Sequence, residues 1–147
     1  MGRGLAIVLT LGAGALVAFQ PPANALLARR VGDLGAAFTS LLFSTLLVGA
    51  IMVVAGQAGQ LGGLRADLRP EYVLGGVAGV AVVLMSLVGV RWLGVGGVAA
   101  ALVGTQLIFS AVIDRMGLLD VTQVGLTPAR IVGIALLIAG TVLVTSR

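Results

Sequence analysis

Long apolar runs, separated by short stretches that contain the charges, organise this sequence. Five of these runs predict helices, at 5–28, 34–55, 71–90, 94–113 and 128–145. A helix needs roughly 20 apolar residues to cross a bilayer, and each run is continuously apolar over about that length. Strands of a membrane barrel would instead alternate over about ten residues. The pattern predicts an all-α integral membrane protein, with five transmembrane helices in one domain, 1–147.

The ends of the runs carry recognisable boundary signals. A third helix can begin at Pro70, because proline is tolerated in a first turn. Thr127 and Pro128 are a plausible cap and first residue for the fifth helix. Arg91 and Trp92 form a short turn at headgroup level, where arginine and aromatic residues are common.

A competing interpretation concerns the N-terminus. Arg3, the apolar core behind it and the small residues at 23–25 resemble a secretory signal with its cleavage site. Against this, the apolar run continues past Ala25, and Arg29 and Arg30 fit the flank of a retained span.

Composition excludes a soluble domain and most chemistry. Of the 147 residues, 59% are hydrophobic and 10% are charged, whereas soluble domains carry about a quarter charged residues. The chain has no histidine or cysteine, so hydrolytic and metal sites lack their usual residues. We expect no enzyme, no cofactor and no bound metal. All basic residues are arginines, which in so apolar a chain are typical of anchors at the interface of the lipid bilayer rather than of nucleic-acid binding.

The nine arginines divide almost evenly between the two sides of the membrane. Five spans put five arginines on one face and four on the other: Arg3, Arg65, Arg69, Arg115 and Arg130, against Arg29, Arg30, Arg91 and Arg147. Because excess basic charge in cytoplasmic loops sets orientation, either a weak bias selects one orientation, or copies insert both ways. An antiparallel homodimer would have ten helices arranged as an inverted repeat, the plan of many secondary transporters.

Two motifs resemble a known family. They are the Q-x3-N of the first helix, Gln20 and Asn24, and GTQLxxSxxIDRxGLL at the end of the fourth. With nearly the whole chain, they are similar to the small YdcZ-like exporters of the drug/metabolite transporter (DMT) superfamily. The resemblance implies half of a ten-helix DMT-type transporter that works as a pair, often through dual topology, in bacterial inner membranes.

Polar residues inside the first span share one face. Gln20 and Asn24 are four residues apart, with Pro21 and Pro22 between them. Each proline deprives the carbonyl four residues earlier of its donor. The segment is either a helix break that lines the substrate path or a kink whose amides bond a neighbouring helix.

The fourth and second spans carry further polar positions. Gln106, Ser110 and Asp114 recur every four residues as one stripe, which should face the interior. Asp114 could couple transport to a proton or cation, or be a solvated or salt-bridged anchor beside Arg115. Ser44, one turn after Ser40, either lines the pore or bonds its own backbone.

Glycines at helical spacing predict close helix packing: Gly75 and Gly79 in the third span, and Gly133 and Gly140 in the fifth, where a second copy could contact them. The first span contains no acid, which favours a neutral, zwitterionic or weakly charged solute.

These features favour a half-size exporter acting as an antiparallel homodimer by alternating access. Its small-molecule substrate would be bound by Gln20, Asn24, Gln106, Ser110 and Ser44. A small dimeric channel and a non-transporting membrane assembly protein are the alternatives. Saturating flux would distinguish a carrier from a channel.

Overall fold

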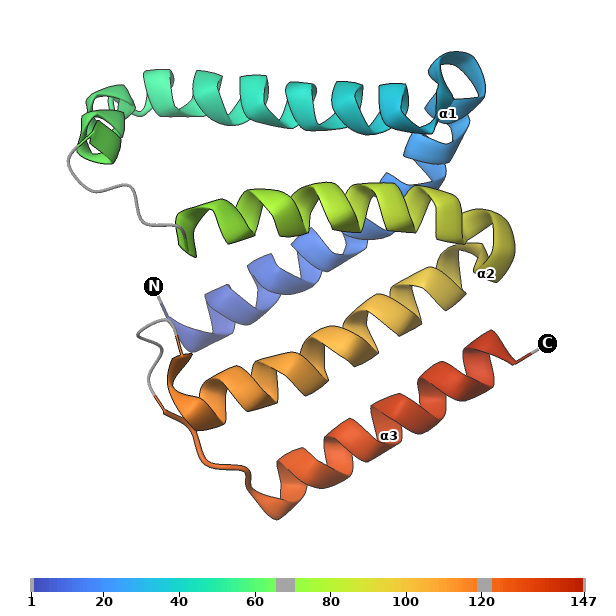
Figure 1. Ribbon diagram of the computed structural model, residues 1–147. Helices are drawn as coiled ribbons and strands as arrows, with labels where there is room; N and C mark the ends of the chain where they lie inside the picture. The colour runs from blue at the N-terminus through green and yellow to red at the C-terminus, as the bar shows by residue number, and fades with distance from the viewer. Residues whose placement is uncertain (1, 66–70, 119–122, 147) are drawn as a thin grey trace. The chain divides into compact units, whose positions relative to one another are not determined.

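The computed structural model describes residues 2–65, 71–118 and 123–146, which are almost entirely helical (Figure 1). Helix α1 spans Arg3–Val54, the short 3-10 helix η1 spans Ala58–Arg65, α2 spans Glu71–Met116 and α3 spans Pro128–Thr145. All three α-helices are long and apolar enough to cross a membrane. The prediction of an all-helical chain with membrane-spanning helices is confirmed.

Glycines interrupt the helical backbone inside α1 and α2. Gly32 has φ 76° and ψ 167°, and Gly94 has φ 69° and ψ 174°. Glycine reaches positive φ without the steric penalty that a Cβ imposes. The ribbon of α1 changes direction sharply beside its label in Figure 1. Gly32 is the residue of α1 with non-helical backbone angles, so residues on the two sides of this glycine can face one another.

Pro21 and Pro22 lie inside α1, and the helical backbone continues through both of them as far as Gly32. The interruption of α1 is therefore at Gly32, between the predicted spans 5–28 and 34–55. Of the two alternatives for the prolines, a break in the helical backbone is not seen. Proline's fixed φ is compatible with a helix, although it removes a hydrogen-bond donor from the turn before it.

The chain divides into two compact units, Met1–Arg91 and Trp92–Arg147. In the first unit, a small core joins both parts of α1 to the beginning of α2. Its buried residues are Ala28, Ala36, Ala37, Val83 and Leu87. The alanines among them allow close approach of helices, as small residues do in membrane proteins.

In the second unit, α3 packs beside the end of α2. The Thr141 hydroxyl donates to the Ala100 carbonyl of α2 at 3.1 Å and to the Leu137 carbonyl of its own helix at 2.8 Å. A Cβ added at Gly104 would lie 2.9 Å from Thr141 Oγ1. This contact therefore depends on a residue without a side chain.

The predicted start of the fifth helix is confirmed at its cap. Thr127 is the N-cap of α3, its hydroxyl accepts a hydrogen bond from the backbone N–H of Arg130 at 3.3 Å, and Pro128 occupies the first turn. Pro70, where we predicted another helix start, lies outside the described residues.

Candidate functional site

A hollow of about 570 Å³ opens in the first unit between the two parts of α1. Eight residues line it: Ala23, Asn24 and Leu27 before Gly32, and Thr39, Ser40, Phe43, Ser44 and Leu47 after it. Half of these residues carry a hydroxyl or an amide. The structure thus brings Asn24 and Ser44, both predicted to bind substrate, into one hollow.

Asn24 is the notable member of this hollow. It is 6% exposed, and its Nδ2 is buried without a hydrogen-bond partner within the described chain. Leaving a buried donor unpaired costs about 1 to 3 kcal/mol, and nearly all buried polar groups in proteins are paired. An acceptor from outside the chain would remove this cost.

The hydroxyls of the hollow are partly satisfied by their own helix. Thr39 donates to the Gly35 carbonyl at 2.8 Å, and Ser44 donates to the Ser40 carbonyl at 2.9 Å. Such back-bonding occupies the proton but leaves the oxygen able to accept. Together with Asn24, the hollow therefore offers one donor group and several acceptors between apolar walls.

No charged residue lines the Asn24 hollow. Across the described residues, no group of three or more His, Cys, Asp or Glu side chains could hold a metal ion. The polar groups that line this hollow are therefore uncharged hydroxyl and amide groups.

The remaining predicted residues of the first span lie beside this hollow or outside it. Gln20 is half-buried, one turn before Asn24, and does not line the hollow. Pro22 lines a different hollow of the same unit, together with Arg29 and Arg91.

The predicted stripe Gln106, Ser110 and Asp114 belongs to the second unit. Gln106 is exposed, and the Ser110 hydroxyl donates to the Leu107 carbonyl at 3.0 Å. Asp114 Oδ2 accepts a hydrogen bond from Arg130 Nη2 at 2.5 Å. This ion pair joins the end of α2 to the first turn of α3, and coupling of transport to Asp114 stays a prediction.

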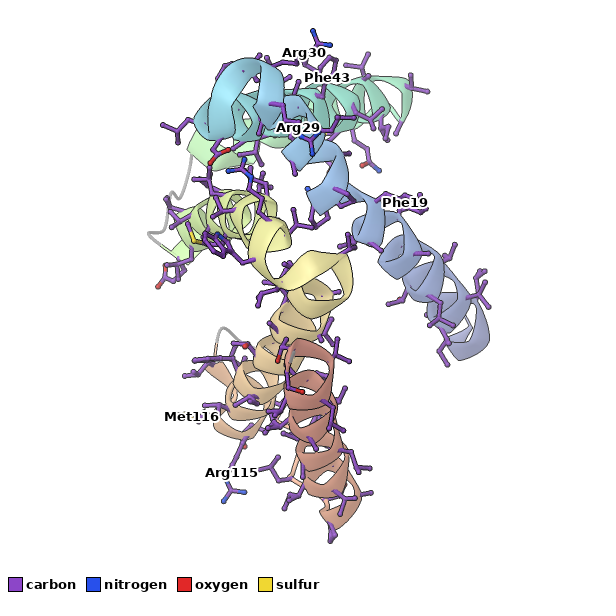
Figure 2. The ribbon with its side chains drawn as sticks, turned by 90° about the vertical axis from the view of Figure 1, so that its right-hand side faces the viewer. Phe19, Arg29, Arg30, Phe43, Arg115 and Met116 are labelled. Atoms are coloured by element: carbon purple, nitrogen blue, oxygen red, sulfur yellow. The ribbon has the colours of Figure 1, made fainter. Side chains whose placement is uncertain are left out.

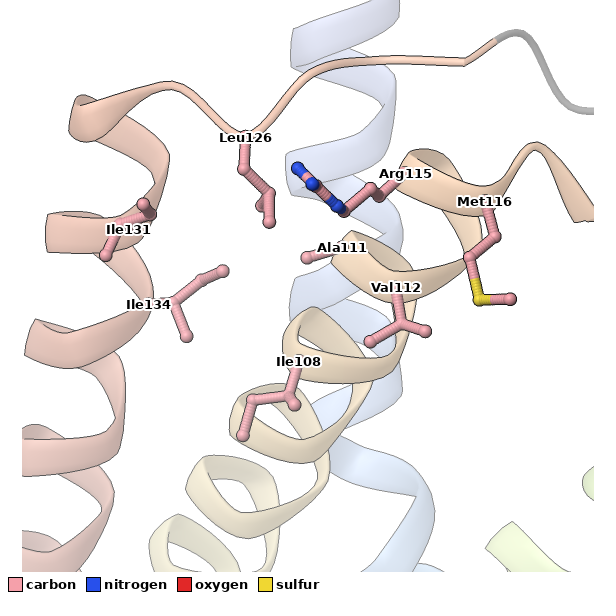
Figure 3. A pocket seen from close by; sticks show the side chains of 8 residues that line it. All are labelled: Ile108, Ala111, Val112, Arg115, Met116, Leu126, Ile131 and Ile134. Atoms are coloured by element: carbon pink, nitrogen blue, oxygen red, sulfur yellow. The ribbon is translucent and has the colours of Figure 1, made fainter.

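The second unit has its own hollow, of about 410 Å³, near the Asp114–Arg130 pair. It is lined by Ile108, Ala111, Val112, Arg115, Met116, Leu126, Ile131 and Ile134. Figure 3 shows the Arg115 guanidinium pointing toward Leu126 across otherwise apolar walls. With a single polar residue in its lining and no predicted substrate residue, it suits a polar solute less well than the Asn24 hollow.

An ion pair in the first unit escaped the sequence analysis. Arg91 Nη1 donates to Asp33 Oδ2 at 3.1 Å, and Nη2 pairs with Oδ1. The hydrogen bond that Arg91 donates to Asp33 raises the pKa of Arg91 above its ordinary value. The signal was present, because two predicted span ends on one membrane face carry opposite charges.

The glycines predicted for helix packing have open space around them. A Cβ at Gly75, Gly79, Gly133 or Gly140 would meet no atom within 4 Å, unlike one at Gly104. Among the described glycines of α2, Gly104 has the tightest contact with α3. A role for Gly133 and Gly140 between two copies stays a prediction.

Comparison with known proteins gives one match. The family model described as "Putative inner membrane exporter, YdcZ" matches residues 5–143. No curated protein and no solved structure matches the chain. The matched range contains every residue that lines the Asn24 hollow.

Proposed function

The chain belongs to the YdcZ family of inner membrane exporters, and on that premise we propose that it binds a small solute in the Asn24 hollow during transport. The unpaired, buried amide of Asn24 is the observation that carries this proposal. A carbonyl or carboxylate oxygen of a solute would accept from Nδ2, and its donors would reach the hydroxyl oxygens opposite. The absence of charge in the lining favours a neutral or zwitterionic solute.

In this proposal the working unit is an antiparallel homodimer, and Gln20, Gln106 and Ser110 contribute to a site that lies between the two copies. In the proposed dimer each chain crosses the membrane five times, with Gly32 and Gly94, both at positive φ, each separating two spans of a long helix. An odd number of spans, with five arginines on one side and four on the other, allows insertion in both orientations. Two inverted copies would alternate access to the site between the two sides of the membrane.

The outer surface of α3 is compatible with such a pair. None of its residues is buried, and most of them are apolar. Large exposed apolar faces mark contacts with lipid or protein. Gly133 and Gly140, seven residues apart on one face, would let a second helix approach closely.

Transport by proteoliposomes tests the site. The protein is reconstituted and screened for counterflow with labelled small zwitterions, beginning with amino acids. Asn24→Ala and Gln106→Ala should each lower flux about tenfold or more, because a lost polar contact of about 1.4 kcal/mol corresponds to a factor of ten. Thr10→Ala is the matched control, since Thr10 is exposed in α1 and bonds only the Ala6 carbonyl.

Cross-linking in the same preparations should show that both variants still assemble. Flux at the normal level in both Asn24→Ala and Gln106→Ala would rule out the proposed site. Reporters at each terminus test the pairing separately, and we expect each terminus on both sides of the membrane. If every copy placed its N-terminus on one side, the antiparallel homodimer would be excluded while the site itself would still stand.

A further inference from the structure

A separate hollow in the first unit is basic and shares no residue with the Asn24 hollow. Its volume is about 430 Å³, and its lining consists of Pro22, Ala25, Leu26, Arg29, Val90 and Arg91. Two guanidinium groups thus meet four apolar side chains. Nothing in the proposed transport path uses this combination.

The two arginines have binding capacity to spare. Arg91 uses one N–H on each of two nitrogens for Asp33, whereas a guanidinium carries five N–H donors. Arg29 has no carboxylate partner among the described residues. Arg29 and Arg91 together with Asp33 therefore have a net positive charge beside the hollow.

The hollow has an apolar end as well as a charged one. Arg29 follows directly on the apolar run of the first span, and Pro22, Ala25 and Leu26 lie one to two turns earlier, within that run. Arginines at a span end lie at headgroup level. A ligand that fills the hollow would therefore meet cations at the interface and apolar groups toward the membrane interior.

We propose that this hollow binds an anionic phospholipid, with its phosphate on Arg29 and Arg91 and an acyl chain along Leu26 and Val90. Guanidinium groups match phosphate oxygens in geometry and charge. Basic pockets between transmembrane helices are known to hold anionic headgroups. Inorganic phosphate carries the same kind of charge but has no acyl chain to contact the apolar lining. This difference distinguishes a phospholipid from free phosphate as the ligand.

Trp92 provides the probe, because it is the single tryptophan of the chain, directly follows Arg91 and is 80% exposed. The full-length protein is placed in phosphatidylcholine vesicles that contain brominated phosphatidylglycerol or, in parallel, brominated phosphatidylcholine. Bromine on the acyl chain quenches tryptophan at short range. We expect the phosphatidylglycerol to quench more strongly, and to do so at lower mole fractions.

Arg29→Gln and Arg30→Gln form a matched pair. Both remove one positive charge from neighbouring exposed positions, but only Arg29 lines the hollow. In Figure 2 Arg30 extends outward at the top of the view, with Arg29 below it. Arg29→Gln should weaken the apparent affinity for phosphatidylglycerol about fivefold, and Arg30→Gln should change it much less. Equal effects would assign the preference to general surface charge and overturn the proposal.

Asp33→Asn tests the same hollow in the opposite direction. Replacing the carboxylate by an amide frees at least one N–H group of Arg91 and removes one unit of negative charge, so the affinity should rise about fivefold. Circular dichroism checks that the helices persist. An unchanged or weaker affinity with the helices intact would contradict the proposal. So would displacement of brominated phosphatidylglycerol by millimolar inorganic phosphate, which would identify a site for the free anion.

Discussion

The two units differ in how closely their neighbouring helical segments pack. In the first unit, the two parts of α1 line an open hollow, and Asn24, one of its four polar lining residues, has an unpaired amide donor. In the second unit, α3 packs against α2, and the Thr141 hydroxyl, which lies beside Gly104, donates to the Ala100 carbonyl of α2. Polar and small residues in spans thus serve binding in one place and packing in the other.

This difference depends on the neighbour rather than on the residue. Asn24 and Thr141 each occupy one position of an apolar helix, and helical spacing alone assigns both to an inward face. A polar side chain opposite a backbone carbonyl becomes a helix contact. A polar side chain opposite a space becomes a candidate ligand group. Substitutions that fill the Asn24 hollow or disturb the contact between Gly104 and Thr141 therefore test this difference between the two units.

Filling the hollow should have the largest effect. Ser40→Leu places a larger apolar side chain among Asn24, Phe43 and Leu47. We expect solute flux to fall about tenfold or more, because the volume and polarity needed for binding are both lost, equivalent to at least about 1.4 kcal/mol. The unfolding midpoint in detergent should stay near that of the unaltered protein, since the space is filled without displacing a packed group.

Thr45→Leu is the control for this substitution. Thr45 lies on the same part of α1, is exposed and bonds the Leu41 carbonyl of its own helix. It does not line the hollow, so its replacement should leave flux unchanged. If Ser40→Leu and Thr45→Leu had the same flux, the hollow would not be the substrate path.

Adding a methyl group to the closed contact should have the next largest effect, on stability. Gly104→Ala puts a Cβ 2.9 Å from Thr141 Oγ1, a distance that forces one of the helices to move. The hydroxyl cannot rotate away without giving up its bonds to Ala100 and Leu137. Overpacking costs about 1 to 3 kcal/mol, and this should appear as a lower unfolding free energy in detergent titrations.

The matched control is Gly49→Ala, in α1, where a Cβ meets nothing within 4 Å. It should be neutral or stabilising, because alanine favours a helix over glycine by up to about 1 kcal/mol. Gly104→Ala should also cost less when Thr141 is already alanine, since the opposing oxygen is gone. An undiminished cost in that background would show that the strain arises elsewhere.

Local signals made much of the fold predictable. The apolar runs predicted the helices, and Thr127 with Pro128 predicted the start of α3, because a cap depends on residues within one turn. The interruption of α1 lies between the predicted spans 5–28 and 34–55, where Gly32 adopts a positive φ. A break at the prolines, one of two predicted alternatives, is not seen, because proline fits a helical φ. The positive φ itself was not predicted. Backbone angles of that kind are set by the tertiary turn.

The candidate site was predictable only in part. Asn24 and Ser44 stood out as polar residues inside spans, and the structure places both in one hollow. Thr39 was missed, because a hydroxyl near a span end has several ordinary roles. The ion pairs Asp33–Arg91 and Asp114–Arg130 join residues far apart in the chain, and spacing within one helix cannot identify such partners.

The smallest effect should come from the hydroxyl of Thr141 itself. Thr141→Val keeps the branched shape beside Gly104 but removes the donor to the Ala100 carbonyl. Hydrogen bonds between transmembrane helices average about 0.6 kcal/mol, because the separated helices also find partners. We expect an unfolding free energy lower by about that amount. Thr45→Val, which removes only a bond within one helix, should be indistinguishable from the unaltered protein. A loss of unfolding free energy as large as that of Gly104→Ala would mean that the Thr141 hydroxyl, rather than the absence of a side chain at Gly104, holds α3 against α2. The contrast with the Asn24 hollow would then lie in hydrogen bonding alone.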